Sequence, residues 1–217
     1  MITHHLSDRL LMAYSADMLP EAFSLAVAAH IELCDDCRAR LASFDAIGGG
    51  LLEGISDAEG GGMGKDALAE TLARLDTGEP ANSAPAPRLG DSILPETLAR
   101  YVGGGVNAVK WRGIGGGVKQ AILPTSSAAT ARLLYIPAGA AVPDHGHSGT
   151  ELTLVLQGAF ADETACFKRG DIEIADEDME HQPIAQPGLD CICLAVTDAP
   201  LKFRGVLPRL AQPFLRI

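Results

Sequence analysis

The hydrophobic and polar positions fall into two patterns that divide the chain near residue 80. In the first third, apolar residues recur three or four positions apart, the spacing that places side chains on one face of a helix. Beyond about residue 105, the apolar runs are short and are separated by glycine and proline, which is typical of strands joined by turns. The pattern predicts an α + β chain in which a helical domain is followed by an all-β domain.

Three helices are expected in the first 50 residues. Ser7 is a suitable N-cap for a helix that begins at Asp8, because its hydroxyl can accept a hydrogen bond from an unpaired backbone N–H. Pro20 suits the first turn of a helix and precedes the apolar run 21–30. A third helix is expected over 36–47.

Three glycines at 48–50 are expected to end this helix and to begin a glycine-rich connector over 48–64. A fourth helix is expected over 66–76. Its apolar face carries leucines at helical spacing, at Leu68, Leu72 and Leu75. This face either packs within its own bundle or docks in a groove of a partner, and the spacing favours neither.

Six apolar runs are predicted to be strands: 106–111, 118–123, 131–136, 152–156, 171–174 and 191–196. In the fourth run, Leu152, Leu154 and Leu156 alternate with other residue types, so this strand should have two distinct faces. Several short strands at this spacing predict a sandwich or a jelly-roll barrel.

The junction between the two patterns is predicted to be a linker. Residues 78–92 are rich in proline, alanine and serine, and a short helix is expected over 95–102. The expected organisation is a helical domain at 1–78, a linker with a short helix at 79–105 and an all-β domain at 106–217.

Charge separates the two domains as well. The chain of 217 residues has a formal net charge of −11. Residues 1–80 hold 14 acidic and 5 basic residues, a net of −9, whereas the remainder holds 14 acidic and 12 basic residues, a net of −2. This balance argues against direct nucleic-acid binding, including a nucleic-acid finger, and favours a partner with basic surfaces. No apolar run is long enough to cross a membrane and no secretory signal is visible, so a cytoplasmic location is expected.

A first group of candidate metal ligands lies in the helical part. The pattern His30-x3-Cys34-x2-Cys37 brings one histidine and two cysteines within eight residues. Zinc usually takes four ligands of this kind in a tetrahedron. If the first two helices form a hairpin, His4 or His5 lies opposite Cys34, and spacing alone does not choose between them. The alternatives are ordinary buried thiols or a redox C-x-x-C pair, and the latter usually lies in a βαβ context.

A second group lies in the β-rich part. His145 and His147 are two positions apart, so on a strand both side chains face the same side. Glu151 follows a tight turn and returns a carboxylate to the same centre, and His181 is a fourth candidate further along the chain. Nitrogen and oxygen ligands of this type suit Zn, Fe, Mn or Ni.

The same residues resemble the first cupin motif, with Gly139 before the histidines and Gly158 after the glutamate. Gly170 and His181 lie at the separation of the second cupin motif. The resemblance implies a cupin barrel and a metal held by the three histidines and the glutamate. The second motif departs from the family's pattern at Asp176, Asp178 and Ala185, so a standard enzymatic site is not expected.

Three further cysteines lie in the β-rich part. Cys191 and Cys193 alternate on one strand, with Cα atoms expected about 6–7 Å apart, a marginal separation for a disulfide. Cys166 lies upstream. Buried free thiols are expected for the pair, and a role in sensing oxidation is open.

The first cluster, on a short helical domain, resembles the zinc-binding anti-sigma domain, whose upstream histidine ligand matches His5. Both clusters in this order, with segments such as ELTLVLQGAF and LDCICLA, resemble the ChrR-type anti-sigma factors over nearly the whole chain. The resemblance implies a regulator, not an enzyme, that holds an extracytoplasmic-function sigma factor inactive in a 1:1 complex. It further implies zinc in both domains and release of the sigma factor under singlet oxygen or related peroxide stress. The alternative is a dioxygenase-like cupin enzyme with an N-terminal zinc-binding interaction module.

Overall fold

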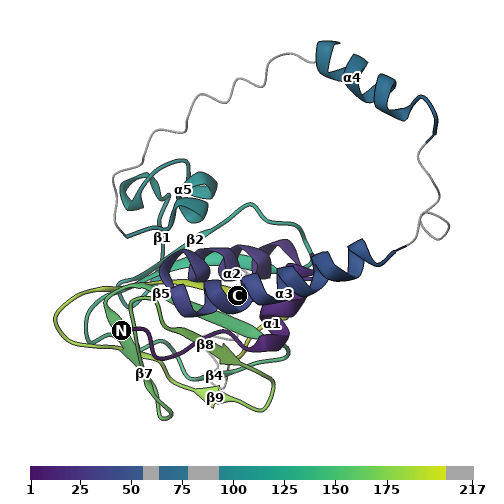
Figure 1. Cartoon of the computed structure of the whole chain (residues 1–217). Coiled ribbons are helices and arrows are strands. Elements are labelled where there is room, and N and C mark those ends of the chain that lie inside the picture. Colours follow the sequence, from purple (N-terminus) through teal and green to yellow (C-terminus); the bar gives the residue numbers. More distant parts are fainter. Residues whose placement is uncertain (56–63, 78–92, 204–217) are drawn as a thin grey trace.

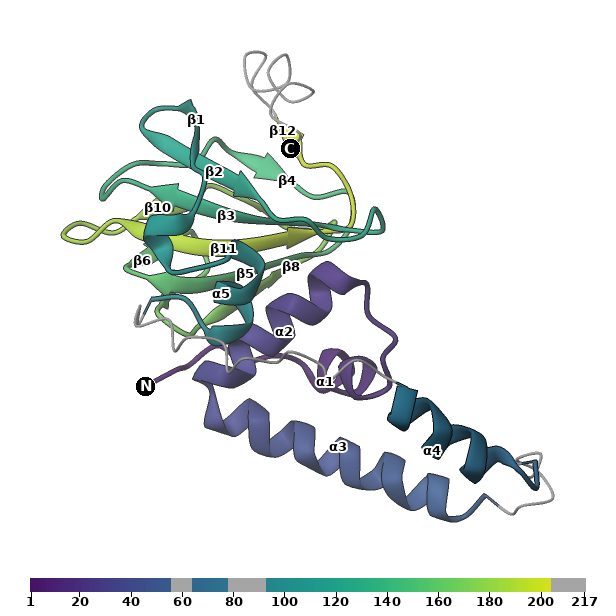
Figure 2. The same cartoon turned by 90° about the horizontal axis from the view of Figure 1, so that it is seen from above.

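The structure, a computed structural model, describes residues 1–55, 64–77 and 93–203. Helices lie on one side of a β-rich barrel (Figures 1 and 2). The helices are α1 (Asp8–Ser15), α2 (Glu21–Leu33), α3 (Asp35–Glu53), α4 (Ala67–Thr77) and α5 (Glu96–Val102), with a short 3₁₀ helix at Val106–Ala108. The α + β fold predicted from the sequence is confirmed. No helix in these described ranges is long and apolar enough to cross a membrane.

The beginnings of the first two helices follow the prediction. The Ser7 hydroxyl accepts a hydrogen bond from the backbone N–H of Leu10 at 3.3 Å, and Pro20 precedes the first turn of α2. Helix α2 extends three residues further than expected and ends at Leu33, followed by the cap residue Cys34, whose backbone is extended. The Cys34 sulfur then caps α3 by accepting from the backbone N–H of Cys37 at 3.5 Å. The C-x-x-C pattern is therefore the junction between two helices.

Helix α3 does not end at the three glycines, and that prediction was wrong. It runs through residues 48–50 to Glu53. Each glycine costs a helix interior about 1 kcal/mol relative to alanine, but a helix that is already formed gains one hydrogen bond with each added residue. Good helix formers at Leu51 and Leu52 follow directly. Of the connector predicted after this helix, residues 56–63 lie outside the described residues.

Helices α4 and α5 lie where the sequence placed them, within one residue. The three leucines of α4 are exposed, at 72% for Leu68, 51% for Leu72 and 71% for Leu75. They therefore do not pack within the helical bundle in this structure. The predicted linker at 78–92 lies outside the described residues.

The barrel consists of one large and two small antiparallel sheets. The six-stranded sheet has the order β1-β2-β3-β11-β5-β8, and the small sheets have the orders β10-β6-β7 and β12-β4-β9. The strands of the large sheet are β1 (Arg112–Gly115), β2 (Val118–Ile122), β3 (Thr130–Ile136), β5 (Glu151–Gln157), β8 (Ile172–Ala175) and β11 (Cys191–Thr197). Those of the small sheets are β4 (His145–Gly146), β6 (Ala159–Ala161), β7 (Cys166–Lys168), β9 (Glu180–His181), β10 (Ile184–Ala185) and β12 (Lys202–Phe203).

Five of the six predicted strands are present, and the run 106–111 is the exception. Its backbone bonds locally: the N–H of Val109 donates to the carbonyl of Val106 at 3.2 Å, and that of Trp111 donates to Val109 at 3.0 Å. A backbone that forms tight turns in this way cannot pair with a neighbouring strand. The run packs its apolar side chains against the core without being part of a sheet.

The large sheet is covered on both faces. Helix α2 packs on its outer face against β3, β5 and β11 (Figure 2). Leu152, Leu154 and Leu156 of β5 join one core with the helices, while alternate residues of the same strand point into the barrel. The two faces predicted for this strand are present, and both are buried. The helices and the barrel therefore share a hydrophobic core.

Candidate metal centres

The first cluster consists of His5, His30, Cys34 and Cys37, whose ligand atoms all lie within 4.8 Å of one another. The Nδ1 atom of His5 lies 3.3 Å from the Cys34 sulfur and 3.6 Å from the Cys37 sulfur. In a tetrahedral zinc site with the usual bond lengths, a nitrogen and a sulfur ligand are about 3.6 Å apart. The spacing of the cluster therefore suits a tetrahedral metal ion.

His30 gives independent support for a ligand site. Its side chain is fully buried on α2, and within the described residues neither ring nitrogen makes a hydrogen bond of normal geometry, although a contact with the Gly170 backbone acts to raise its pKa. Burial, assisted by the proximity of His5, lowers the pKa of His30 to about 4, so the ring is neutral at pH 7. A buried neutral imidazole without a hydrogen-bond partner is costly unless another group, such as a metal ion, takes the lone pair.

The two thiols are buried at the start of α3. Burial raises the pKa of Cys37 to about 11, so without a cation this thiol stays protonated at pH 7. The Nη1 atom of Arg40 lies 3.7 Å from its sulfur, and Asp8 of α1 holds the Arg40 guanidinium at 2.5 Å. A metal ion reverses the effect of burial, because only the thiolate is a strong ligand.

The structure chooses between the two candidate N-terminal histidines. His5 points into the cluster, whereas the ring of His4 packs on Phe167 of the barrel at a centroid distance of 4.4 Å. The Nδ1 atom of His4 lies 3.6 Å from an Asp171 oxygen. Adjacent residues of an extended segment point in opposite directions, so only one of the two reaches the helices.

The segment that carries His5 is fastened to the barrel. The backbone N–H groups of Thr3 and His4 donate to Oδ1 of Asp171 at 2.7 and 3.0 Å, and the N–H of Ile172 donates to the carbonyl of His4 at 3.3 Å. Asp171 is 1% exposed. Gly170 has φ +89°, and a Cβ there would lie 2.6 Å from the Ile2 side chain. Sequence reasoning did not single out Asp171, since an aspartate between a turn and a strand carries no signal of its distant partner.

The second cluster lies inside the barrel and contains His145 of β4, His147 and His181 of β9. The Nε2 atom of His181 lies 3.3 Å from the Nε2 atoms of both other histidines. Two nitrogen ligands of a tetrahedral zinc ion are about 3.3–3.4 Å apart, so these three rings also suit a metal ion. All three side chains are at most 3% exposed.

In two of the three rings, the opposite nitrogen has partners that orient the ring. The Nδ1 atom of His145 donates to the Pro143 carbonyl at 2.8 Å, and that of His181 lies 3.1 Å from Asp162 and 3.2 Å from Glu173. Partners of this kind fix the tautomer and leave Nε2 for a metal ion. Asp162 and Glu173 carry no local signal in the sequence, because only the tertiary structure brings them to His181.

Burial acts to lower the pKa of all three histidines, but the net shift differs among them. It lowers the pKa of His145 and of His147. Burial also acts to lower the pKa of His181, but the hydrogen bond and charge of Glu173, together with Asp162, outweigh it and raise the pKa to about 9. Burial raises the pKa of Glu173 to about 7, against the opposing influence of His181.

Glu151, the fourth predicted residue of this centre, lies beside the three rings. One carboxylate oxygen accepts from the Thr153 hydroxyl at 2.9 Å, and the other lies 3.7 Å from Nδ1 of His147. Gly158, which ends β5, has φ +70°, and a Cβ there would lie 2.7 Å from the Asp190 carbonyl oxygen. The spacing from Glu151 to Gly158 is thus fixed by one seven-residue strand and its turn.

The remaining cysteines are free. Cys191 and Cys193 are buried with their sulfur atoms 3.4 Å apart, as expected for neighbouring thiols on one face of a strand. Hydrogen bonding to Cys191 and burial raise the pKa of Cys193. Cys166 is exposed.

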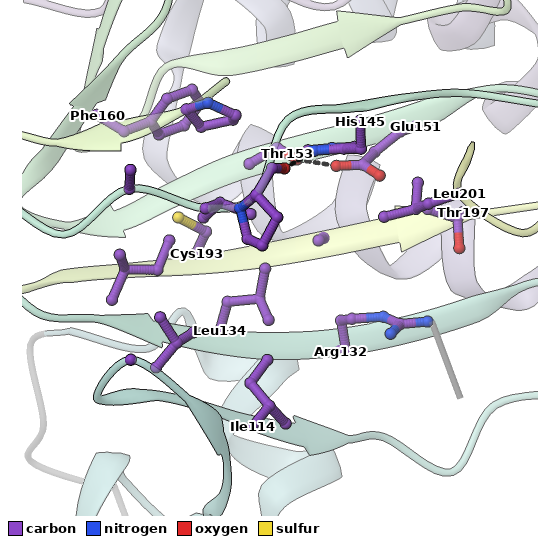
Figure 3. Close-up of a pocket in the computed structure, with 18 of the residues that line it drawn as sticks. Ile114, Arg132, Leu134, His145, Glu151, Thr153, Phe160, Cys193, Thr197 and Leu201 are labelled. Carbon is purple, nitrogen blue, oxygen red and sulfur yellow. Dashed lines mark hydrogen bonds between the residues drawn. The ribbon is translucent and has the colours of Figure 1, made fainter. Parts of the chain in front are cut away.

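A cavity of about 410 Å³ opens beside the second cluster, on the inner face of the large sheet (Figure 3). His145, Glu151 and Arg132 line it toward one end, and Phe160, Cys193 and Leu134 line it toward the other.

Comparison with known proteins agrees with this architecture. A family model described as "ChrR Cupin-like domain" matches residues 102–200. The chain is 57% identical over 216 residues to the "Anti-sigma-E factor ChrR" of Cereibacter sphaeroides, and the match covers 100% of this chain and 99% of that protein. In the crystal structure of Rhodobacter sphaeroides SigE in complex with the anti-sigma ChrR, a 54% identical chain matches with a TM-score of 0.78, covering 91% of this chain and 99% of that one.

A helical His/Cys domain packed on a cupin-like barrel, together with these matches, defines the class: an anti-sigma factor. More narrowly, the chain belongs to the ChrR family of anti-sigma factors. This relationship confirms the prediction of a regulatory protein rather than an enzyme.

Proposed function

We propose that this protein binds an extracytoplasmic-function sigma factor in a 1:1 complex and holds it inactive. The observation that carries this proposal is the match over almost the whole chain to a relative whose crystal structure is a complex with SigE. The acidic first 80 residues, with a net charge of −9, suit the basic surfaces with which a sigma factor meets DNA and polymerase.

The apolar face of α4 is the proposed contact with the sigma factor. Leu68, Leu72 and Leu75 are each more than half exposed, and exposed apolar side chains gathered on one helix face commonly mark an interaction site. The end of α3 adds further exposed apolar residues at Leu51 and Leu52. A groove on the partner that takes an amphipathic helix would cover such a face.

Both centres are proposed to bind zinc, with His5, His30, Cys34 and Cys37 as ligands of the first. The donor set of two nitrogens and two sulfurs closes a tetrahedral site, which is the usual form of a structural zinc site. It would fasten the N-terminal segment to the junction of α2 and α3, and so hold the helices in the arrangement that meets the sigma factor.

The second proposed site uses His145, His147, His181 and Glu151. The convergence of three Nε2 atoms, with Nδ1 of two rings held by other groups, supports it. Glu151 would complete it after a rotation of its side chain away from Thr153. We assign these roles within domains at 1–78 and 106–217, joined by a linker with a short helix at 79–105.

Release of the sigma factor under singlet oxygen or related peroxide stress is the proposed signal response, in the cytoplasm. Oxidisable side chains, the histidine rings and Cys191 with Cys193, lie on the inner side of the barrel, whose outer face packs on α2. A chemical change in the barrel would therefore reach the helices through the shared core.

The experiment is co-expression with the sigma factor encoded nearest to this gene, followed by copurification and measurement of the affinity. Replacing Leu68, Leu72 and Leu75 together by serine should weaken binding about 100-fold or more, since each buried leucine contributes about 1.5–3 kcal/mol. Leu189→Ser, at an exposed leucine of the barrel, is the matched control and should bind normally. Unchanged affinity of the triple variant would remove α4 from the interface, and absence of any complex with wild-type protein would overturn the proposed function.

The signal response has a separate test. The purified complex is exposed to a photosensitiser and light, and sigma-dependent transcription is measured. His147→Ala should still inhibit transcription in the dark and should release less sigma factor in the light. Normal release from this variant would contradict a sensing role for the barrel cluster.

A further inference from the structure

The four candidate ligands of the helical cluster differ in their access to solvent. His30 and Cys37 are fully buried and Cys34 is 2% exposed, whereas 31% of the His5 side chain is exposed. Because the other three ligands are buried, a metal ion enters and leaves the cluster most directly past His5.

A surface hollow of about 440 Å³ lies on this side of the cluster. His5 and Cys34 are both part of its lining, so the hollow leads to the ligands themselves. Among the described residues, none that lines it also lines the cavity inside the barrel. A divalent cation with its shell of water needs roughly 200 Å³, at about 30 Å³ for each water molecule, so the hollow can admit a hydrated ion.

Asp36 lies in the lining of this hollow. Its Oδ2 atom lies 3.8 Å from Nδ1 of His5, the same nitrogen that lies 3.3 Å from the Cys34 sulfur. Nitrogen and oxygen ligands of one tetrahedral zinc ion are about 3.3–3.5 Å apart, so a small rotation of the Asp36 side chain would let both atoms bind one ion. The Asp36 side chain is 65% exposed, and its carboxylate therefore faces solvent as well as the cluster.

The neighbouring charges leave this carboxylate available. Asp35, the other acidic residue of the lining, forms an ion pair with Arg38. The charge of Asp36 acts on Arg40, but the Arg40 guanidinium binds Asp8 at 2.5 Å. Within the described residues, Asp36 forms no ion pair with a lysine or an arginine.

Arg169 adds a positive charge to the lining of the hollow. Its Nη1 atom donates to the backbone carbonyls of Ile93 and Leu156, which hold the side chain in place. A fixed positive charge disfavours a cation that rests in the hollow. The hollow therefore suits the passage of an ion better than its storage.

We propose that Asp36 is the entry ligand of the helical metal centre. The Asp36 carboxylate and Nδ1 of His5 first hold an incoming hydrated divalent cation in the hollow. The buried ligands Cys34, Cys37 and His30 then displace the Asp36 oxygen, and the two thiols give their protons to solvent water as they become thiolates. Departure follows the same steps in reverse, so Asp36 speeds uptake and release equally. The inference rests on the zinc site proposed above.

The test uses the full-length protein loaded with Co²⁺ in place of zinc, because Co²⁺ bound to thiolate has a charge-transfer band in the near ultraviolet. The proposed ligands in the barrel are nitrogen and oxygen atoms, so this band reports the helical centre. Loss of the band in excess EDTA, taken where the rate no longer depends on EDTA concentration, gives the release rate. Equilibrium competition with EDTA gives the dissociation constant, and the release rate divided by this constant gives the uptake rate.

Asp36→Asn should slow uptake and release about tenfold each and leave the dissociation constant unchanged, because the carboxylate stabilises only the transition between the free and the bound ion. Asp36→Glu keeps a carboxylate and should restore most of both rates. Asp35→Asn removes the same charge from the same first turn of α3 and is the matched control, with rates expected to equal those of wild type. Thermal unfolding verifies that each variant is folded.

Three results would overturn the entry role: wild-type rates in Asp36→Asn, equal slowing in both asparagine variants, or faster release with unchanged uptake. The last result would mean that Asp36 stabilises the bound ion and does not admit it. A wild-type protein without the thiolate band would overturn the metal site itself, and the entry role with it.

Discussion

The two histidine clusters are assembled by different means. In the helical cluster, His5 comes from an extended N-terminal segment, His30 and Cys37 from two different helices, and Cys34 from the junction between them. In the barrel cluster, β4 pairs directly with β9, and the register places His145 opposite His181. The first arrangement depends on side chains from separate segments meeting one another, whereas the second follows from backbone pairing that exists without them.

Because of this difference, a metal ion would have a different role in each cluster. The helical cluster joins the N-terminal segment to the junction of α2 and α3, so an ion there contributes to folding itself. The barrel already has a closed core, so an ion there adds affinity and chemistry to a site that is in place. Variants in the two clusters and in the segment between them test this difference.

The largest effect is expected for Cys34→Ala combined with Cys37→Ala. Loss of the two thiolates should remove one zinc per chain and unfold the N-terminal helices, because a structural zinc site supplies about 10–16 kcal/mol of apparent binding free energy. Metal analysis and far-UV circular dichroism measure both outcomes. Cys166→Ala, at an exposed cysteine, is the control. If the double variant keeps its helices and its thermal stability, the helical cluster is not structural.

A smaller effect is expected for His147→Ala in the barrel cluster. Its Nδ1 atom has no hydrogen-bond partner within the described residues, and its Nε2 atom lies 3.3 Å from that of His181, whose Nδ1 atom keeps Asp162 and Glu173 as partners. The variant should lose the barrel zinc and keep its fold. In the presence of zinc, it should therefore lack the stabilisation that binding gives the wild type, about 4 kcal/mol when free zinc exceeds the dissociation constant a thousandfold. Chemical unfolding with and without added zinc measures the free energy of unfolding of both proteins. If the variant is also about 4 kcal/mol less stable than wild type when both are stripped of metal, the loss does not come from zinc and the prediction is wrong.

Asp171→Asn tests the connection between the two regions. The amide keeps one acceptor oxygen but loses the charge that receives the N–H groups of Thr3, His4 and Lys168. The free energy of unfolding should fall by about 2 kcal/mol, since hydrogen bonds to charged groups are the strong ones. Zinc affinity of the helical cluster should fall with it, because His5 follows this anchor directly. Competition with a chelator measures the affinity.

The control for this change is Asp190→Asn, whose carboxylate accepts from the Ala138 N–H at 2.9 Å within the barrel. It should leave the zinc affinity of the helical cluster unchanged. Equal weakening in both aspartate variants would mean that general destabilisation, and not the anchor, controls the first metal centre.

The smallest effect is expected for Gly49→Ala in α3. Nothing lies within 4 Å of a Cβ at this position, so the methyl group meets no obstacle. The substitution should raise the stability of the helix by about 0.5–1 kcal/mol. Thermal unfolding monitored by circular dichroism measures it. A destabilised variant would indicate that the glycines at 48–50 serve a bend or a contact that forms only with the sigma factor.

Local patterns in the sequence predicted much of the secondary structure. Ser7 and Pro20 identified two helix starts because a cap and a first-turn proline act within a few residues. The end of α3 was missed because glycine lowers helix stability without forbidding it. The run 106–111 was misassigned because its apolar residues pack on the core from a turn, where composition resembles that of a strand.

The sequence predicted those ligands of the candidate sites that lie close together along one segment. His30, Cys34 and Cys37 lie together because they occupy successive turns around a helix junction, and His145 and His147 because they are two apart in extended chain. Asp162 and Glu173 reach His181 only through tertiary structure. The same holds for the contact of Asp171 with the N-terminal segment. No short-range rule connects residues 168 positions apart, as Asp171 and Thr3 are.

The burial of both faces of the large sheet has a consequence for the order of synthesis. Helix α2 is complete about 160 residues before β11, the middle one of the three strands on which it packs. At about 5–20 residues per second, a ribosome needs roughly 8–30 s to add that length. Throughout this interval the apolar side of α2 has no sheet to cover it. The nascent helices must therefore be shielded by something else, and early capture of metal at Cys34 and Cys37, or of the sigma factor itself, would protect the chain from aggregation before its barrel exists.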